Sequence, residues 1–265
     1  MVKLDDVLIA SKLIDGEEVD NYGRLYYSSS ENLDEIFKRV NVEGKDVLTI
    51  LGSSDQYFYA YYYGAKSVES FDINKLTKYY YYLRLWGIKY LDEFYPDIHN
   101  HRYIYELLKL VECSNSNEEE AYSFWNNYIR SIYPFDNTRL FYVNGNSKRN
   151  IDIDKLNDSI YGRKNNFYNA NIKNSFTDKK YDVIMLSNML EYCLGDLSVV
   201  RDNIDSLLKD NGVVVCSNML TNGYMEHKVF SEVFNRVSLG TYRNNDYFGM
   251  EFPLGYVYKK DVNKK

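Results

Sequence analysis

The chain has 265 residues, a length that suits one large domain or one core domain carrying an insertion. Its net charge is −6 at pH 7 and its pI is near 5.3, so composition predicts no overall basic field that would attract nucleic acid or an anionic membrane. Three cysteines, Cys113, Cys193 and Cys216, are too few and too scattered for a disulfide framework or a cysteine-rich metal site.

The amino-terminal stretch argues against export. Acidic residues stand beside its short apolar run, which is not typical of a signal peptide, and no stretch approaches the length of a membrane span. We therefore expect a cytoplasmic protein with no transmembrane segment. Nothing in the sequence predicts the oligomeric state.

Residues 1–44 are expected to form a helical adapter before the first strand. Apolar spacing predicts helices over residues 4–14 and 30–40, the second starting at a Ser or Asn. Between them, "DNYGRLYYSSS" (residues 20–30) is expected to be a loop. Segments that precede the first strand of nucleotide folds often close over the ligand, so we expect this loop to matter for binding.

Strand, helix, strand and helix then alternate with tight turns over residues 46–91. The strands are "DVLTIL", which ends at Gly52, and "SVESFDI". The helices are "DQYFYAYYYGA", stopped by Gly64, and the segment 75–91. This alternation is typical of parallel βαβ units.

The alternation stops over residues 92–150, where the pattern predicts a helical insertion at the carboxyl edge of the sheet, and then resumes. The later segments expected as strands are 165–171, 181–187, 212–218, 236–242 and 255–260, with helices at about 196–209 and 226–236. The last two strands are expected to form an antiparallel hairpin.

These elements predict an α/β fold, a Rossmann-like, mostly parallel sheet of seven strands with helices on both faces. The expected domains are the adapter (1–44), a core made of residues 45–91 and 151–260, and the helical insertion (92–150).

The turn after the first strand reads Gly52-Ser53-Ser54-Asp55-Gln56-Tyr57. A dinucleotide site favours G-x-G-x-x-G, because the pyrophosphate approaches the backbone closely and the helix packs tightly. Only the first glycine is present here, and a carboxylate near the helix start would repel the pyrophosphate. NAD and FAD are therefore disfavoured.

S-adenosylmethionine carries no phosphate, so its site tolerates fewer glycines. It needs one sharp turn, polar groups for its amino-acid end and a carboxylate for the ribose hydroxyls. Asp72 ends the second strand twenty residues after Gly52, where a carboxylate reaches a ribose. We expect its side chain to be only partly buried. The alternative is an ordinary βαβ unit with a turn glycine and a solvated aspartate.

The order of five segments resembles the class I S-adenosylmethionine-dependent methyltransferase superfamily along nearly all of residues 45–260. The segments are "VLTILGSSDQ", "SVESFDIN", "YNANIKNSF", "KYDVIMLSNMLEY" and "LLKDNGVVVCSN". The turn "GSSDQ" also resembles the aminocarboxypropyl transferases of betaine-lipid synthesis, which share the fold and the cofactor but use a different carbon of that cofactor.

The resemblance implies a cofactor, S-adenosylmethionine, and roles for residues at the strand ends. The methionine end of the cofactor would lie along the first turn, the ribose on the acid after the second strand, and the adenine beside the residues that follow. The implied cofactor-binding residues are Gly52, Ser53, Ser54, Asp72, Ile73, Asn74, Asn171, Ser187 and Asn188.

Glu191 and Tyr192 follow the fourth strand and are the candidate catalytic residues, Glu191 as a general base and Tyr192 as a positioning group. A helix-start glutamate and a packing tyrosine are the structural alternative. The segment lacks the Asn/Asp-Pro-Pro-Tyr/Phe signature of amino-group nucleic-acid methylation. We therefore expect methyl transfer to a small-molecule acceptor with no nucleic acid, and keep aminocarboxypropyl transfer or a non-catalytic binding module as alternatives.

Three further pairs of side chains have an ordinary structural explanation. His99 and His101 lack companion ligands, so no metal site is expected. Arg84 and Lys89 suit either an anionic substrate or a solvated helix face. The tyrosines before the first strand, Tyr22 and Tyr26, suit either a cap over the cofactor or core packing.

Overall fold

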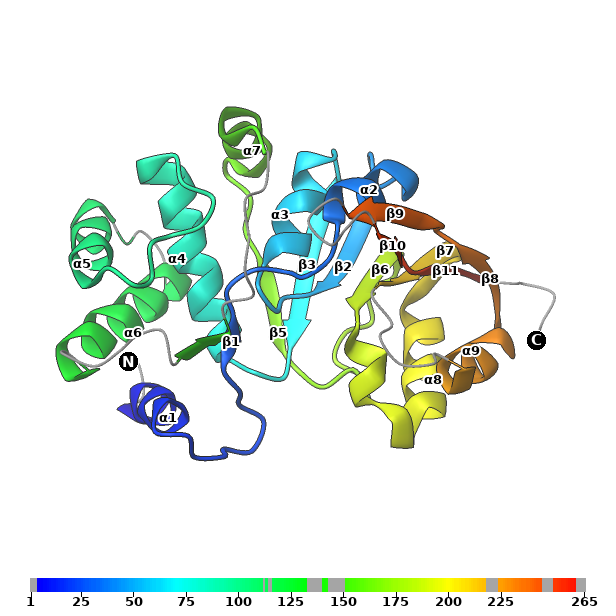
Figure 1. Cartoon of the computed structure of the whole chain (residues 1–265), viewed down its shortest axis with the longest axis horizontal. Helices are drawn as coiled ribbons and strands as arrows, with labels where there is room; N and C mark the ends of the chain where they lie inside the picture. The colour runs from blue at the N-terminus through cyan, green and yellow to red at the C-terminus, as the bar shows by residue number, and fades with distance from the viewer. Residues whose placement is uncertain are drawn as a thin grey trace. The chain divides into compact units, whose positions relative to one another are not determined.

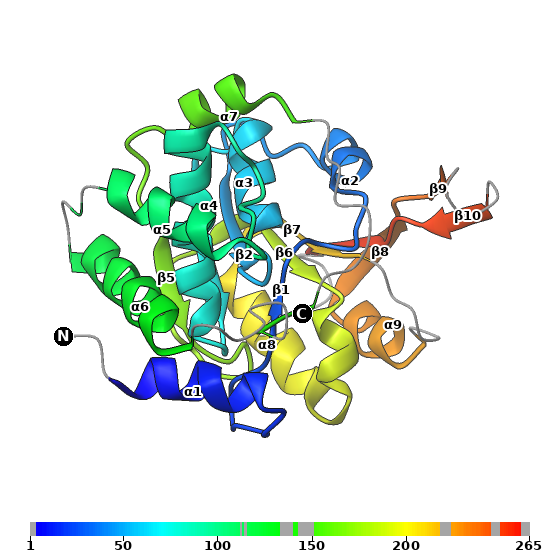
Figure 2. The same cartoon turned by 60° about the vertical axis from the view of Figure 1, so that its left-hand side comes forward.

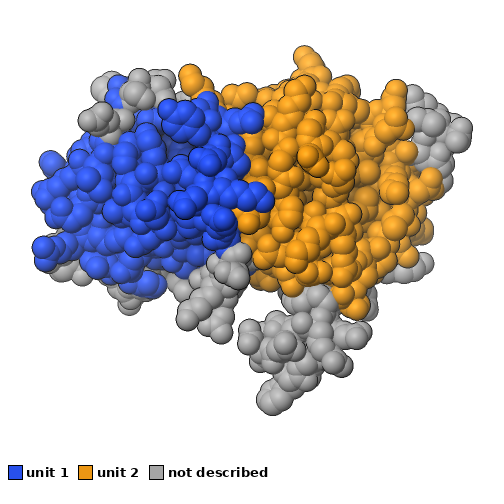
Figure 3. All heavy atoms as spheres, turned by 90° about the horizontal axis from the view of Figure 1, so that it is seen from above, with its two compact units in different colours: residues 1–29, 51–55, 72–163 blue, residues 30–50, 56–71, 164–265 orange. Residues whose placement is uncertain are grey.

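The structure, a computed structural model, describes residues 4–111, 113, 116–132, 140–142, 151–217, 224–244 and 250–260. The chain divides into two units, each built from several stretches of sequence (Figure 3). Unit 1 comprises residues 1–29, 51–55 and 72–163, and unit 2 comprises residues 30–50, 56–71 and 164–265.

A seven-stranded sheet forms the centre of unit 2, in the order β5-β3-β2-β6-β7-β11-β8 (Figure 1). The strands are β2 (Asp46–Ile50), β3 (Ser67–Asp72), β5 (Asn166–Asn169), β6 (Tyr181–Ser187), β7 (Leu208–Cys216), β8 (Phe234–Ser238) and β11 (Tyr256–Lys260). A separate hairpin of β9 (Thr241–Asn244) and β10 (Met250–Pro253) lies between β8 and β11 in the chain.

The central strands pair in parallel, β2 with β3 and β6, and β6 with β7, whereas β11 is antiparallel to both β7 and β8. Numbered along the chain, the sheet strands have the order 3-2-1-4-5-7-6. The central strands are continuous apolar runs, as expected for strands covered on both faces. The chain direction across the sheet reverses between β2 and β6, which is the switch point where open α/β sheets bind ligands.

The core of unit 2 lies between the sheet and the helices that follow β6 and β7. Figure 1 shows α8 (Leu197–Leu207) and α9 (Tyr224–Ser231) beside this sheet. Apolar residues at helical spacing on α8, among them Val200 and Ile204, pack with Ile184 of β6. Unit 2 also holds α2 (Leu33–Arg39) and most of α3 (Asp55–Tyr62). The first residue of α3, Asp55, belongs to unit 1.

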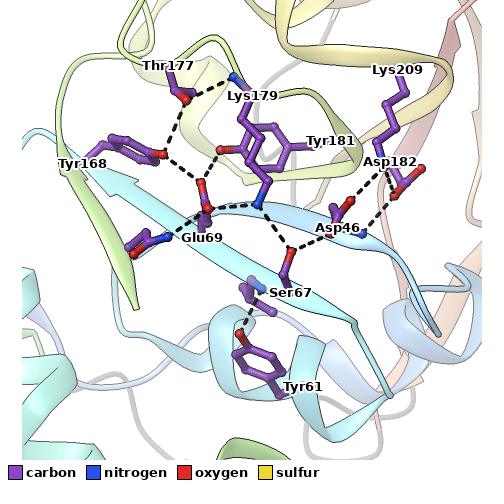
Figure 4. A network of polar contacts seen from close by, with 12 residues as sticks. Asp46, Tyr61, Ser67, Glu69, Tyr168, Thr177, Lys179, Tyr181, Asp182 and Lys209 are labelled. Atoms are coloured by element: carbon purple, nitrogen blue, oxygen red, sulfur yellow. Dashed lines mark hydrogen bonds and ion pairs between the residues drawn. The ribbon is translucent and has the colours of Figure 1, made fainter. Parts of the chain in front are cut away.

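A polar network replaces apolar packing toward the amino ends of these strands (Figure 4). Glu69 accepts hydrogen bonds from Tyr168, Tyr181, Asn166 and Lys179 at 2.6–3.0 Å. Burial alone would raise the pKa of Glu69, but these hydrogen bonds outweigh it and lower the pKa to about 2. The network therefore ties β3 to β5 and β6 through one ionised carboxylate.

Unit 1 is helical. Its helices are α1 (Leu4–Ile14), α4 (Leu76–Leu91), α5 (His101–Leu110), α6 (Ser116–Ile132) and α7 (Ile153–Ile160), and β1 (Leu25–Tyr26) pairs in parallel with β4 (Phe141–Tyr142). Figure 2 shows α1, α4, α5 and α6 gathered together. Partly buried ion pairs fasten α1 and α6 to the start of α4, because Lys75 pairs with Asp6 at 2.8 Å and with Glu120 at 2.9 Å.

Most of the expected elements are confirmed. The seven sheet strands and the reversed final pair are present, as are the helices predicted at 4–14, 30–40, 55–65 and 75–91. Asn32 caps α2 by accepting the N–H of Glu35, which explains the predicted start. The sequence patterns did not predict α7, β1, β4 or the β9–β10 hairpin.

Candidate functional site

The turn after β2 belongs to unit 1 and has an unusual backbone. Gly52 and Ser54 both have positive φ, 45° and 69°, and the latter is a sparsely populated conformation for a residue with a side chain. Within the described residues, a Cβ placed on Gly52 would meet no atom within 4 Å other than those of its chain neighbours, so there is open space beside the turn. The buried Oγ of Ser54 has no hydrogen-bond partner within the described residues.

Asp72 fixes this turn. Its carboxylate accepts the N–H groups of Gly52 and Asn74, each at 2.9 Å. The residue is 7% exposed, so the expectation of a partly buried side chain is wrong. Burial raises the pKa of Asp72 to about 6, although hydrogen bonds from Asn74 and Gly52 oppose the shift. At neutral pH the carboxylate is ionised and hydrogen-bonded to the backbone of the turn after β2 and of the loop after β3.

The two residues after Asp72 differ in whether their side chains are available to a ligand. Asn74 is 8% exposed, its Oδ1 accepts the N–H of Leu76 at 3.1 Å, and its Nδ2 donates to the carbonyl of Gly23 at 2.8 Å. It therefore forms an Asx turn at the start of α4 and anchors the loop before the sheet. Ile73 is 40% exposed, so its apolar side chain is the one available to a flat ligand ring.

A buried ion pair supports the turn from α4. Arg84 and Asp55 lie 2.8 Å apart and both side chains are fully buried. The guanidinium also donates to the carbonyl of Ser53 and lies 4.3 Å from the ring centre of Phe94. Both interpretations of Arg84 offered by the sequence, binding of an anionic substrate and a place on a solvated helix face, are wrong, because its side chain is buried against Asp55. Because the charge of Arg84 compensates that of Asp55, Asp55 would repel a pyrophosphate less than the sequence alone suggested.

The loop before the sheet is fastened to the same region of unit 1. Tyr80 donates from its hydroxyl to the carbonyl of Tyr27 at 2.7 Å, and the N–H of Ser29 donates to Asp55. Desolvation raises the pKa of Tyr27. Tyr26, expected either to cap a ligand or to pack in a core, is 43% exposed and lies against the ring of Tyr142 at 5.4 Å.

A second polar group lies in unit 2 at the carboxyl ends of β2, β6 and β7. Glu31 accepts hydrogen bonds from Ser187 Oγ at 2.5 Å, from Ser217 Oγ, and from Gln56 Nε2 at 2.7 Å. Gln56 Oε1 in turn accepts from Thr49 Oγ1 at 2.9 Å. We call these five residues the Glu31 cluster. Ser187, the last residue of β6, has a φ of 55°.

The remaining expected site residues also belong to unit 2. Asn171 Oδ1 accepts the N–H of Lys173 at 3.0 Å, which makes a local turn after β5. Asn188 begins the 3-10 helix η2 (Met189–Tyr192), and its carbonyl accepts the N–H of Glu191 at 3.1 Å. Glu191 is half-buried and Tyr192 is 70% exposed. A second 3-10 helix, η3 (Leu194–Asp196), follows.

Sequence reasoning missed Glu31, Gln56 and the Asp55–Arg84 pair as parts of these arrangements. The stretch "SSSE" before α2 shows no apolar period and resembles a solvated loop. Glu31 reaches Ser187 and Ser217 across 156 and 186 residues of sequence, which local pattern does not reveal. An available signal was a polar side chain within or directly after each of β2, β6 and β7, because the carboxyl ends of neighbouring parallel strands meet.

His99 and His101 line an open surface hollow of about 730 Å³ in unit 1 together with Asp97 and Arg102. Within the described ranges, no group of three or more His, Cys, Asp or Glu side chains is placed to hold a metal ion. In the same ranges no helix is long and apolar enough to cross a membrane.

The sheet order 3-2-1-4-5-7-6, with its reversed final strand, decides the fold. This is the class I S-adenosylmethionine-dependent methyltransferase fold. No protein-family model and no curated protein matches the chain. Among solved structures, it is similar to a TehB-like S-adenosylmethionine-dependent methyltransferase from Corynebacterium glutamicum, with 10% identity, TM-score 0.44 and coverage of 97% of this chain and 96% of that one.

Two other similar structures carry different names. One is a ribosomal protein L11 methylase from Lactobacillus delbrueckii subsp. bulgaricus, with 14% identity, TM-score 0.42 and coverage of 86% of this chain and 75% of that one. The other is TrmN from Thermus thermophilus, with 11% identity, TM-score 0.39 and coverage of 86% and 48%. At these identities the likeness concerns the fold.

The expectation of a small-molecule acceptor with no nucleic acid is wrong as a restriction. Structures similar to this chain include the ribosomal protein L11 methylase and TrmN, so the fold is not confined to small acceptors. The expectation rested on the absence of one nucleic-acid methylation signature and on an acidic pI. The pI averages over the whole surface and does not describe the surface around a site.

Proposed function

We propose that the protein is an S-adenosylmethionine-dependent transferase, most simply a methyltransferase, whose cofactor binds at the turn after β2 and at the end of β3. The observation that supports this best is the link between Gly52 and Asp72 in unit 1, beside open space and the unpartnered, buried Oγ of Ser54 within the described residues. The turn thus combines room for a ligand with polar groups for it.

These residues fit the parts of the cofactor. Asp72, ionised at neutral pH, is an acceptor for ribose hydroxyls, which would share or replace one of the backbone donors that it now accepts. Ile73 offers an exposed apolar side chain for the adenine. Ser54 Oγ and the backbone at Gly52 suit the polar amino-acid end. When bound, the cofactor supplies a methyl group on a sulfonium, and the protein mainly has to position a nucleophile.

A dinucleotide fits this turn less well. The Oγ and the carbonyl of Ser53 are engaged with Asp55 and Arg84. Ser54 stands at the second glycine position and is buried. Tyr57 stands at the third and is buried. A pyrophosphate would need the close backbone approach that glycines allow at those positions.

Calorimetric titration of the protein with S-adenosylhomocysteine and with NAD tests the proposal. We expect S-adenosylhomocysteine to bind and NAD to give no heat of binding. Binding of NAD with no response to S-adenosylhomocysteine would overturn the proposed cofactor.

Glu191 stays our candidate for the general base and Tyr192 for a positioning hydroxyl. Both lie in η2 directly after β6, and the half-burial of Glu191 leaves it accessible to a proton donor. The Glu191→Gln variant should lower kcat while leaving cofactor affinity unchanged. Equal kcat values on the same acceptor would return Glu191 to the role of a helix-start residue.

Aminocarboxypropyl transfer is the second candidate, favoured by the Gly52-Ser53-Ser54-Asp55-Gln56 turn, whose Asp55 is buried in an ion pair. The product separates the two reactions, because methyl transfer leaves S-adenosylhomocysteine and aminocarboxypropyl transfer leaves methylthioadenosine.

We further propose that residues 92–150 select the acceptor. We also propose that the chain works in the cytoplasm, because its three cysteines are all free.

A further inference from the structure

The carboxylate of Asp55 joins several separate stretches of unit 1. One of its oxygens accepts a hydrogen bond from the hydroxyl of Tyr95 at 2.9 Å and pairs with Arg84 at 2.8 Å. The other accepts the N–H of Ser29 and the hydroxyl of Ser53, the latter at 3.1 Å. These donors come from the loop before the sheet, from the turn after β2, from α4 and from the segment that follows α4. Asp55 therefore fixes the end of the proposed cofactor turn from several directions.

Ser54 lies between two residues that these contacts hold. The carbonyl of Ser53 accepts a hydrogen bond from Arg84, and Asp55 follows Ser54 directly in the chain. The φ of Ser54, 69°, is in the left-handed region. That conformation is costly for a residue with a side chain and persists only where the surroundings impose it. The contacts of Ser53 and Asp55 impose it here.

Tyr95 holds this arrangement through both its hydroxyl and its ring. The hydroxyl binds Asp55, and the ring centre lies 4.5 Å from the guanidinium of Arg84 and 5.3 Å from the ring centre of Tyr27. Arg84 and Asp55 are fully buried, whereas Tyr95 is half-buried. Tyr95 also belongs to the segment 92–150, which we propose selects the acceptor. Its hydroxyl therefore links that segment to the cofactor turn.

We propose that Tyr95 is a positioning residue for the cofactor. It acts through Asp55, which keeps Ser54 in the conformation that receives the amino-acid end of the cofactor. The inference rests on the proposed function and adds a residue to it. Without the hydroxyl, Ser54 can relax to a commoner φ, so that only a fraction of the free protein has the binding conformation. The apparent affinity for the cofactor then falls by that fraction.

The variant Tyr95→Phe tests this, because it removes the hydroxyl and keeps the ring. Calorimetry compares S-adenosylhomocysteine with 5′-methylthioadenosine, which has the same nucleoside without the amino-acid end. Tyr95→Phe should weaken S-adenosylhomocysteine about five- to tenfold, from relaxation of one left-handed residue, and leave methylthioadenosine unchanged. An equal loss for both nucleosides would assign Tyr95 a general packing role and overturn the inference.

A double-mutant cycle with Ser54→Gly tests whether Tyr95 acts through Ser54. Glycine adopts positive φ about as readily as negative φ, so a glycine at this position has no strain for the Tyr95 hydroxyl to oppose. In the Ser54→Gly background, Tyr95→Phe should therefore change the affinity for S-adenosylhomocysteine less than about twofold. The same loss in both backgrounds would overturn the inference. This comparison uses S-adenosylhomocysteine alone, so it is decisive even where methylthioadenosine binds too weakly to measure.

The matched control is Tyr105→Phe, which makes the same change at an exposed tyrosine of α5 and should leave both affinities at wild-type values. Equal affinities of wild type and Tyr95→Phe for S-adenosylhomocysteine would show that this inference is wrong while the proposed function stands. Wild type that binds neither nucleoside overturns the proposed function and this inference with it.

Discussion

Asp72 combines two tasks in one side chain. In the proposed function it receives a ribose at the end of β3, and in the structure it holds the backbone of the Gly52 turn and of its own loop. Ribose binding requires an exposed carboxylate, whereas the carboxylate that holds the backbone is buried. This burial raises the pKa of Asp72 to about 6. We therefore expect ligand binding and local stability to be coupled at this residue.

The Asp72→Ala variant should lose both. Removing the carboxylate leaves the buried N–H groups of Gly52 and Asn74 without their acceptor, and the relief of a buried charge offsets only part of that cost. We expect a loss of about 2 kcal/mol in the free energy of unfolding by urea titration. Affinity for S-adenosylhomocysteine should fall about a hundredfold, from the loss of two charge-assisted hydrogen bonds.

The control is Asp20→Ala, which removes an exposed aspartate of unit 1 and should change neither quantity. Unchanged stability in Asp72→Ala would mean that the Gly52 turn holds its conformation without the carboxylate. Unchanged affinity would move the ribose away from β3.

Affinity should also depend on pH through Asp72. The ionised carboxylate is the form that accepts ribose hydroxyls, and its pKa in the free protein is about 6. As pH falls through 6 the group takes up a proton, so binding of S-adenosylhomocysteine should weaken toward tenfold per pH unit below that value. Calorimetry between pH 8 and pH 5 measures this. In Asp72→Asn the slope should vanish, and a slope that persists would assign it to another group.

Elements with a clear period were predictable from the sequence. The buried runs at β2 and β6 and the apolar stripe of α8 are local signals, and chain order then restricts a parallel sheet to few topologies. The pairing of β1 with β4 was not predictable, because each has two residues and they are 116 positions apart. Helix α7 did carry a signal, since the Asp152 side chain accepts the N–H of Lys155 as an N-cap.

The same contrast holds for the site. Gly52, Asp72 and Ser187 stand at strand ends, and their places follow from the strand pattern. Which side chains are free to bind does not follow, because partners such as Glu31 for Ser187 and Arg84 for Asp55 come from distant segments. Local sequence thus indicates where a functional residue stands, and tertiary structure decides what its polar atoms contact.

The Glu69 network should make the sheet sensitive to acid. The pKa of Glu69 is lowered from 4.5 to about 2, so the native state binds this proton less readily than the unfolded chain. Its contribution is present above pH 4.5 and is lost as pH falls from 4.5 through 2, amounting to roughly 3 kcal/mol when complete. Urea unfolding of wild type and Glu69→Gln should differ most near pH 6, and the difference should fall by about half by pH 3 and close toward pH 2.

A matched control is Glu106→Gln, which removes an exposed glutamate whose contact is with Lys109 one helical turn away. Surface pairs of this kind contribute little, so its unfolding should follow wild type at every pH. Parallel curves for wild type and Glu69→Gln across the acid range would show that Glu69 titrates normally and that its hydrogen bonds do not depend on its charge.

At the scale of the whole molecule, the chain passes between the two units five times, after residues 29, 50, 55, 71 and 163. Two of these crossings fall within single elements. Helix α3 begins with Asp55 in unit 1 and continues in unit 2, and strand β3 ends with Asp72 in unit 1. Neither unit is a continuous stretch of sequence. The proposed cofactor turn, residues 51–55, lies between two of these crossings.

This connectivity leads us to expect one cooperative unfolding transition. Loss of unit 1 would remove Asp55 from α3 and Asp72 from β3, and so would disturb elements that unit 2 needs. The sequence provides a clean test, because both tryptophans, Trp86 and Trp125, are buried in unit 1. Tryptophan fluorescence therefore follows unit 1, whereas the sheet signal in far-ultraviolet circular dichroism follows unit 2.

The two signals should give the same midpoint during thermal unfolding, and S-adenosylhomocysteine should raise both together, because a ligand that binds only the native state stabilises everything that unfolds with its site. The variant Asp72→Ala should lower both midpoints and lose the ligand-induced rise. Separate midpoints, with fluorescence changing first and the ligand moving that transition alone, would show that unit 1 unfolds by itself. In that case the crossings at α3 and β3 would act as hinges between two independently stable parts.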